Sequence, residues 1–78
     1  MKVKVYSTQA CPYCHMAEDF LKENKIEFEH IDVSNDQEAA KEMVEKSGQM
    51  GVPVIDVDGE IVIGFDRGRL KELLKISE

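Results

Sequence analysis

The sequence predicts an α/β fold in which three helices flank a mixed four-stranded sheet, in the order β-α-β-α-β-β-α. Segments with alternating or continuous apolar residues, typical of strands, are separated by segments whose apolar residues recur at helical spacing. The pair Asp58-Gly59 lies between two apolar runs and strongly indicates a β-hairpin. Because the chain has 78 residues, we expect residues 1–78 to form a single domain.

The first strand and the first helix are predicted near the N-terminus. Residues 2–7 alternate polar and apolar side chains and include valines, which favours a strand. Pro12 suits the first turn of a helix because its missing N–H would have no partner there. The helix should continue to Glu23, since apolar residues recur at helical spacing: Met16, Ala17, Phe20 and Leu21.

A second strand and a second helix follow. Residues 27–33 alternate again, and after a slip in phase we assign their apolar side to Phe28, Ile31 and Val33. A helix connects this strand to the first, so the two should be parallel with a right-handed crossover. Asn35 or Asp36 can cap a helix that runs to about Lys46 and ends at Gly48. Its apolar face should contain Ala39, Ala40, Met43 and Val44.

The C-terminal part of the chain predicts a hairpin and a last helix. Residues 54–57 and 60–63 are two apolar runs that form antiparallel strands joined by the Asp-Gly turn. Asp66 can cap a helix that runs to about Ile76. The leucines of this helix should face inward: Leu70, Leu73 and Leu74.

Composition and charge exclude several classes of function. Lys and Arg total 10 and Asp and Glu total 16, a net charge of −6. Nucleic acids and anionic membranes are bound through basic patches, so we expect neither as a partner. The apolar runs are too short to cross a bilayer, and the N-terminus lacks the pattern of a signal peptide. We therefore expect a cytoplasmic protein, and an acidic domain of this kind should be a monomer.

The two cysteines, Cys11 and Cys14, are the candidate catalytic residues. A disulfide across so short a loop would contribute little stability, and C-x-x-C in a cytosolic chain more often does chemistry or binds a metal. One alternative is a pair of buried core thiols, for which a strand-to-helix loop holding proline and tyrosine is a poor place. Another is zinc, which needs four ligands, whereas His15 and His30 are the only further good candidates. We therefore expect no metal site.

The placement of the two cysteines predicts their roles. Cys11 follows a strand and begins a helix, where free N–H groups and the helix dipole favour a thiolate. Cys14 lies about one turn further on, within reach of Cys11 but with poorer access to solvent. Cys11 should therefore attack a disulfide, and Cys14 should resolve the resulting mixed disulfide.

Three segments resemble the glutaredoxins, which have the thioredoxin fold. Cys11-Pro12-Tyr13-Cys14 is identical to the dithiol glutaredoxin motif, and Gly51-Val52-Pro53 is similar to the family's Thr-Val-Pro segment, whose proline is cis. Gly64-Phe65-Asp66 falls where glutaredoxins carry a Gly-Gly turn and acidic residues. The resemblance covers the whole element order and implies a thiol–disulfide oxidoreductase with no tightly bound cofactor.

The resemblance also implies a glutathione site. Glutathione would be the co-substrate and would pair its backbone with Val52, beside Pro53, which places its sulfur next to Cys11. The start of the last helix, at Asp66 and Arg67, would bind the γ-glutamyl end. Two further residues are expected at the site: Tyr13, with an exposed ring beside the sulfur, and Gln49, at the glycyl end. Disulfide-containing proteins are the expected substrates.

Departures from the family pattern leave a second electron source open. The lysine that many glutaredoxins carry before the first cysteine is absent from the segment Ser7-Thr8-Gln9-Ala10. The turn Gly64-Phe65 is similar to that of the glutaredoxin-like hydrogen donors of ribonucleotide reductase, which are recharged by thioredoxin reductase. The Cys-Pro-Tyr-Cys motif favours glutathione instead.

Two further functions fit the sequence less well. A metal chaperone also places C-x-x-C between a first strand and a first helix, but its fold needs a hairpin directly after that helix. Here a helical segment, residues 36–46, intervenes. Bridging of an iron–sulfur cluster between two chains occurs among glutaredoxins mostly with other motifs.

Overall fold

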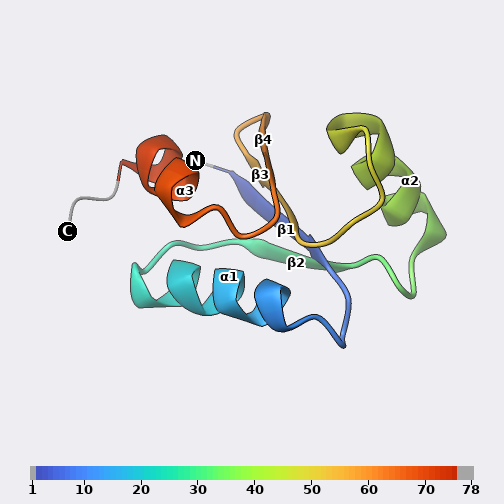
Figure 1. The fold of residues 1–78 in the computed structure, drawn as a ribbon, viewed down its shortest axis with the longest axis horizontal. Coiled ribbons are helices and arrows are strands. Elements are labelled where there is room, and N and C mark those ends of the chain that lie inside the picture. The colour runs from blue at the N-terminus through green and yellow to red at the C-terminus, as the bar shows by residue number, and fades with distance from the viewer. Residues whose placement is uncertain (1, 76–78) are drawn as a thin grey trace.

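The structure is a computed structural model that describes residues 2–75. Four strands and three helices form within this range, in the predicted order (Figure 1). Their bounds are β1 (Val3–Ser7), α1 (Pro12–Glu23), β2 (Glu29–Asp32), α2 (Gln37–Ser47), β3 (Val54–Val57), β4 (Glu60–Ile63) and α3 (Arg67–Leu74).

The four strands form one mixed sheet in the order β2-β1-β3-β4. β1 is parallel to β2, as the helical crossover predicts, and antiparallel to β3. β3 and β4 form the expected antiparallel hairpin. Its turn, Asp58-Gly59, has positive φ at both residues, as a two-residue hairpin turn requires. The predicted fold class is confirmed.

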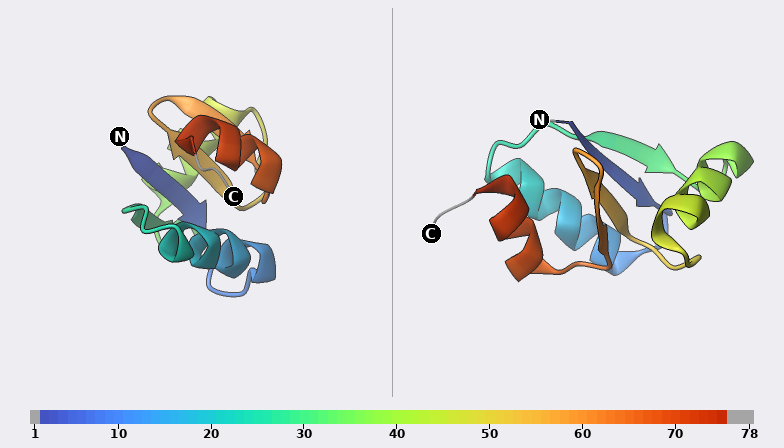
Figure 2. Two further views of the ribbon diagram at one scale, coloured as in Figure 1. Left: turned by 90° about the vertical axis from the view of Figure 1, so that its left-hand side faces the viewer. Right: turned by 90° about the horizontal axis from the view of Figure 1, so that it is seen from above.

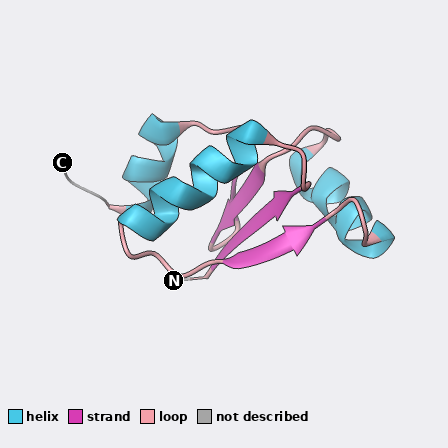
Figure 3. Cartoon of the chain, turned by 90° about the horizontal axis from the view of Figure 1, so that it is seen from below, coloured by secondary structure: helices cyan, strands magenta, loops and turns pink. Residues whose placement is uncertain are grey.

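The helices cover both faces of the sheet (Figures 2 and 3). α1 and α3 pack on one face, where their buried side chains contact alternate residues of the strands: Val3, Val5, Ala17, Phe20, Leu21, Ile55, Val57, Val62, Leu70 and Leu74. α2 packs on the other face in a smaller apolar cluster around Tyr6, Met43 and Val54. The period of two along each strand sends neighbouring residues to opposite faces, which explains the two clusters.

Side chains and left-handed backbone set the helix ends. The carboxylate of Asp36 accepts a hydrogen bond from the Ala39 N–H at 3.1 Å and caps α2. Gly48 ends α2 with a φ of 74°, a conformation that costs glycine little. Asp66 caps α3 in the way that Asp36 caps α2. These ends agree with the sequence analysis.

The prediction for the second strand is wrong in two respects. β2 is shorter than the expected 27–33, and its apolar residues do not share a side. Phe28 packs against the α1 and α3 cluster, whereas Ile31 and Val33 pack against the α2 cluster. The backbone keeps its period of two without a slip, so even and odd positions face opposite layers. Residues 28–33 therefore contribute apolar side chains to both layers.

Other boundaries differ slightly. The first strand begins at Val3 rather than Lys2. α3 ends at Leu74, and the predicted end at Ile76 lies outside the described residues. On α2, Ala39 and Met43 are buried, whereas Ala40 is only partly buried.

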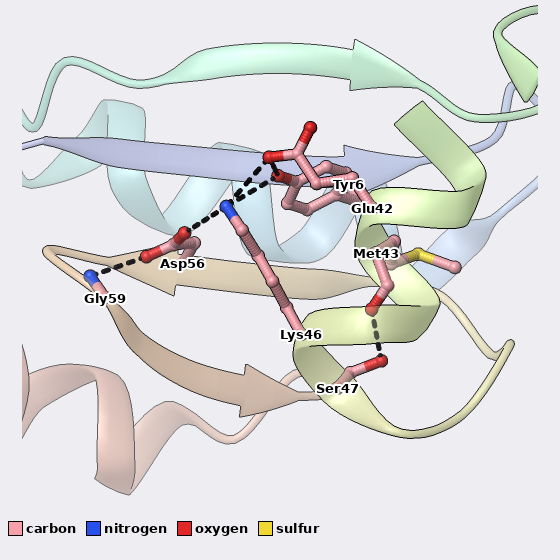
Figure 4. Close-up of polar contacts among 7 residues, drawn as sticks. All are labelled: Tyr6, Glu42, Met43, Lys46, Ser47, Asp56 and Gly59. Carbon is pink, nitrogen blue, oxygen red and sulfur yellow. Dashed lines mark hydrogen bonds and ion pairs between the residues drawn. The ribbon is translucent and has the colours of Figure 1, made fainter. Parts of the chain in front are cut away.

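A network of polar side chains joins α2 to the sheet (Figure 4). The buried Tyr6 hydroxyl donates to Glu42 at 3.0 Å, and the Lys46 ammonium donates to that hydroxyl at 3.2 Å and to Asp56 at 2.9 Å. Burial alone would raise the pKa of Asp56, but hydrogen bonds from Lys46 and the Gly59 N–H outweigh burial and hold it below its usual value. Among the described residues, no buried side-chain nitrogen or oxygen lacks a partner.

None of the helices formed by residues 2–75 combines the length and the apolar character needed to span a membrane.

Candidate active site

The sheet register brings three loops to one end of the sheet (Figure 1). Tyr6, near the end of β1, pairs with Val54, the first residue of β3, so the loop after β1 emerges beside the loop before β3. Val54 also pairs with Ile63, the last residue of β4, so the loop that leads to α3 emerges there as well. The Gly64 N–H donates to the Pro53 carbonyl at 2.8 Å and ties the last two loops together.

Cys11 is the N-cap of α1. Its backbone is extended, with φ of −123° and ψ of 102°, and its sulfur accepts a hydrogen bond from the Cys14 N–H at 3.2 Å. Pro12 occupies the first helical position, as predicted. Hydrogen bonds from the first turn and the positive end of the helix dipole both stabilise negative charge on this sulfur. The Cys11 sulfur therefore lies where a nucleophilic thiolate is favoured.

Cys14 lies one turn further along α1 and is almost fully buried, at 1% exposure. Burial, reinforced by the neighbouring Cys11, raises the pKa of the Cys14 thiol to about 12, although the Thr8 backbone acts in the opposite direction. Cys14 is therefore protonated at neutral pH. Both cysteines are free thiols. A nucleophilic sulfur at a helix start, followed one turn later by a second thiol, is the arrangement that two-step thiol–disulfide exchange needs.

The loop before β3 has the form that the sequence resemblance implies. The peptide bond between Val52 and Pro53 is cis. Val52 precedes β3, and within residues 2–75 its backbone N–H and carbonyl have no hydrogen-bond partner. Its side chain packs against the α2 cluster, which fixes the direction of this backbone. An extended peptide could therefore pair with Val52.

The other predicted site residues are divided between the site and structural contacts. Tyr13 is exposed, at 63%, next to Cys11. The Asp66 carboxylate accepts the Arg69 N–H at 3.0 Å, so it acts as a helix cap. The guanidinium of Arg67 lies over the Phe20 ring, 5.5 Å from its centroid.

Gln49 does not extend freely from its loop. Its side-chain amide donates to the Gly51 carbonyl at 2.9 Å and accepts from the Gly51 N–H at 2.7 Å. Gly51 takes the place of the threonine in the family pattern, and any Cβ at this position would lie 2.7 Å from the Gln49 oxygen. The glycine therefore allows Gln49 to fold back onto its own loop.

One pair beside the cysteines was not found from the sequence. Glu18 lies one turn after Cys14 on the buried side of α1, and its carboxylate contacts the Nδ1 atom of His30 on β2. Alternation with Phe28 or Ile31 predicts that His30 is a surface residue of the strand, and its side chain is half exposed. The spacing of Glu18 from Cys14 was the available signal, because residues four apart share a helix face.

No group of three or more side chains among residues 2–75 is arranged to bind a metal ion. The two histidines are separate: His30 contacts Glu18, and the ring of His15 lies 3.4 Å from the Gln9 carbonyl.

Comparisons with known proteins agree with this geometry. The glutaredoxin family model matches residues 3–62. An uncharacterized glutaredoxin-like protein of the rubredoxin operon of Clostridium pasteurianum is 38% identical over 73 residues, which cover 94% of this chain and 97% of that protein. Glutaredoxin 3 of Escherichia coli is 32% identical over 80 residues, covering 94% of this chain and 96% of that protein.

Solved structures show the same fold. A mutant of the thioredoxin-like protein BC3987 superposes with a TM-score of 0.92 at 34% identity, covering 97% of each chain. The NrdH-redoxin of Escherichia coli has a TM-score of 0.79 at 23% identity, covering 100% of this chain and 97% of that one. The chain therefore belongs to the glutaredoxin family of thiol–disulfide oxidoreductases and has a thioredoxin-like fold.

Proposed function

We propose that this protein is a glutathione-dependent dithiol oxidoreductase that reduces protein disulfides and glutathione mixed disulfides. Cys11 is the nucleophile and Cys14 is the resolving thiol. The observation that carries the proposal is the hydrogen bond from the Cys14 N–H to the Cys11 sulfur at the start of α1. An N–H donor at this position favours negative charge on the attacking sulfur.

The reaction proceeds through one mixed disulfide. The Cys11 thiolate attacks a substrate disulfide, a new S–S bond forms at Cys11, and the released substrate sulfur takes the electron pair and then a proton. Cys14 loses its proton and attacks the Cys11 sulfur, which releases the second substrate sulfur and leaves a Cys11–Cys14 disulfide. Two molecules of glutathione then reduce this disulfide and are themselves oxidised to glutathione disulfide.

Glutathione binds along the loop before β3. The backbone N–H and carbonyl of Val52, which lack partners within the described residues, support pairing with an extended peptide. In this proposal Pro53, Tyr13 and Arg67 contact the bound peptide, and the start of α3 at Asp66 offers amide groups to a carboxylate. Gln49 reaches the glycyl end after exchanging its bonds with Gly51.

The test follows the electrons from glutathione. A glutathionylated peptide is supplied with reduced glutathione and glutathione reductase, and NADPH consumption is followed. In parallel, backbone amide shifts are recorded while glutathione is titrated into Cys14→Ser protein. Turnover with shifts at Val52 and residues 66–67 supports the proposal, whereas disulfide exchange without a glutathione effect would remove glutathione from it.

A second electron source is favoured by one observation. Phe65, in the place of the family's second glycine, packs edge-on against Phe20 with ring centroids 5.9 Å apart. This aromatic pair and the missing lysine before Cys11 support a chain recharged by thioredoxin reductase that donates electrons to ribonucleotide reductase. NADPH oxidation by a thioredoxin reductase in the presence of this protein and a disulfide substrate would favour this function over the first.

The proposed reaction requires both thiols to be kept reduced, so we propose that the protein acts in the cytoplasm. In this proposal residues 1–78 form a single domain that acts as a monomer.

A further inference from the structure

One buried acidic side chain has no part in the mechanism above. Glu18 is 9% exposed and lies on the same buried side of α1 as Cys14. Residues four apart on a helix are neighbours, with Cβ atoms about 5–6 Å apart. A carboxylate is costly to bury without a partner, so its position calls for an explanation.

The partner of Glu18 comes from the sheet. His30 on β2 faces α1, and its Nδ1 atom contacts a carboxylate oxygen of Glu18. The Ser7 hydroxyl, at the end of β1, lies 3.3 Å from the same nitrogen. The imidazole side chain is 50% exposed, whereas that of Glu18 is 12% exposed. The Glu18–His30 pair thus leads from the buried side of α1 to solvent.

We propose that Glu18 accepts the proton of the Cys14 thiol in the resolving step, and that His30 positions the carboxylate and connects it to water. The proposal rests on the function proposed above, because it concerns the step in which Cys14 attacks the mixed disulfide.

The resolving step needs such an acceptor. Burial raises the pKa of Cys14 to about 12, so hardly any thiolate is present at neutral pH. Cys11 and Glu18 are the ionisable neighbours that act on the charge of Cys14. In the mixed disulfide the Cys11 sulfur carries no charge and cannot take a proton, so of these two neighbours only the Glu18 carboxylate can accept it.

The step balances in protons and electrons. The proton of Cys14 passes to the Glu18 carboxylate while the Cys14 sulfur attacks the Cys11 sulfur. The Cys11–Cys14 bond forms, the bond from Cys11 to the substrate breaks, and the substrate sulfur leaves with the electron pair and is protonated by water. Glu18 afterwards returns its proton to water along the half-exposed His30 ring.

Other charged groups near the pair bear on its pH dependence. His30 also borders an open hollow of about 550 Å³, whose other charged lining residues are one lysine and five carboxylates: Lys4, Glu29, Asp32, Asp36, Glu38 and Glu42. The lining includes residues of α2, which covers the opposite face of the sheet from α1, where the His30 ring meets Glu18. Measurements at two salt concentrations separate the screened surface charges from the buried pair.

The test isolates the resolving step. Cys11 is loaded with glutathione by exchange, and the loss of bound glutathione as the Cys11–Cys14 bond forms is followed by rapid quenching and mass spectrometry over a range of pH. Glu18→Gln should slow this step about 100-fold at neutral pH, the scale of a lost general base. The rate should recover in alkaline solution, where hydroxide ionises Cys14.

Controls separate the possible failures. Glu23→Gln makes the same change at an exposed position of α1 and should leave the rate unchanged. Exchange of glutathione at Cys11 in a Cys14→Ser background should be unaffected by Glu18→Gln. His30→Gln, which alters the exposed partner and serves if Glu18→Gln does not fold, should slow resolution less than Glu18→Gln and show the same alkaline recovery.

Two results would overturn the inference. If the Glu18→Gln variant releases glutathione from Cys11 as fast as the parent protein or faster at neutral pH, the carboxylate only opposes ionisation of Cys14. If the resolving rate depends on pH in the same way in the parent, in Glu18→Gln and in His30→Gln, the inference is likewise wrong. If the parent protein itself cannot be loaded with glutathione at Cys11, it is the proposed function that fails.

Discussion

The two cysteines differ because of where each lies relative to the first turn of α1. Cys11 precedes the first helical residue and receives an N–H donor from the turn. Cys14 lies inside the helix, where its own N–H is that donor and its sulfur is buried. A displacement of one helical turn thus separates a sulfur that accepts an N–H donor from a buried sulfur that is protonated at neutral pH, although both residues are of the same type.

Substituting each cysteine should therefore have different effects. We expect Cys11→Ser to abolish all exchange, because no nucleophile remains at the helix start. Cys14→Ser should retain reduction of glutathione mixed disulfides and lose reduction of dithiol substrates, which need the resolving attack. Steady-state assays with a glutathionylated peptide and with a protein disulfide check this. Equal losses in both variants on both substrates would contradict the assigned roles.

Alkaline pH should destabilise the reduced protein through Cys14. Its pKa is raised to about 12 in the fold by burial first and by Cys11 second, against about 8.5 for a free thiol. The folded state therefore holds the proton more tightly, and its stabilising effect is complete below pH 8.5 or so and is lost as pH rises towards 12.

Urea unfolding of the reduced protein and of Cys14→Ser across this range measures the effect. The difference in unfolding free energy between the two should change with pH only above the pKa of a free thiol. A constant difference would show that Cys14 ionises as easily in the folded as in the unfolded chain.

At the residue scale the sequence predicted what is local and missed what crosses between elements. Cys11 and Cys14 share one motif, so their roles could be predicted from the start of a single helix. Glu18 and His30 meet only because β2 turns its even positions towards α1. The sequence predicts His30 only as a surface residue of this strand, so its contact with Glu18 was not predicted.

The helix ends depend on single side chains and could be predicted at the element scale. Asp36→Ala removes the carboxylate that accepts the Ala39 N–H at 3.1 Å and should lower the unfolding free energy by about 1 kcal/mol. Asp36→Asn keeps a side-chain oxygen and should lower the unfolding free energy much less. Chemical denaturation of the three proteins checks the order, and equal losses in the two variants would show that the cap contributes nothing.

Strand bounds were predicted well where a tight turn fixes them and poorly where it does not. The Asp-Gly turn sets the register of β3 and β4, and both match residues 54–57 and 60–63. β2 has no such turn, and its length depends on how far β1 offers hydrogen-bond partners, from Lys4 to Ser7. The length of β2 therefore could not be predicted from residues 27–33 alone.

For the whole molecule, the site depends on strand order rather than on any one segment. The loops with Cys11, Pro53 and Asp66 meet because β3 lies between β1 and β4. The family resemblance supplied this arrangement, since element order alone allows other sheets. The network around Tyr6 was not predicted, because its members come from β1, α2 and β3.

Removing the cation of this network should loosen the attachment of α2 to the sheet. Lys46→Met leaves the buried carboxylate of Asp56 without its ammonium partner and should cost about 2 kcal/mol of unfolding free energy at neutral pH. The pKa of Asp56 is lower in the folded protein than its unfolded value of about 3.9. The ion pair therefore adds to the unfolding free energy above that pH, and its contribution is lost as the pH falls through the folded pKa.

Denaturation of the parent and of Lys46→Met at neutral and at acid pH measures both parts. The gap between them should narrow in acid. Lys41→Met, an exposed lysine of the same helix, serves as the control and should leave stability unchanged at both pH values. A gap that is the same at both pH values would place the effect in packing rather than in the ion pair.

The two edge strands, β2 and β4, disfavour pairing of this sheet with another chain. Each is four residues long, and each exposes a glutamate: Glu29 on the first and Glu60 on the second. A second copy of the chain that paired with either edge strand would gain few backbone hydrogen bonds. Its own net negative charge would also be repelled by these glutamates. Concentrated solutions of the protein should thus resist growth into fibrils, even though the sheet has two edge strands.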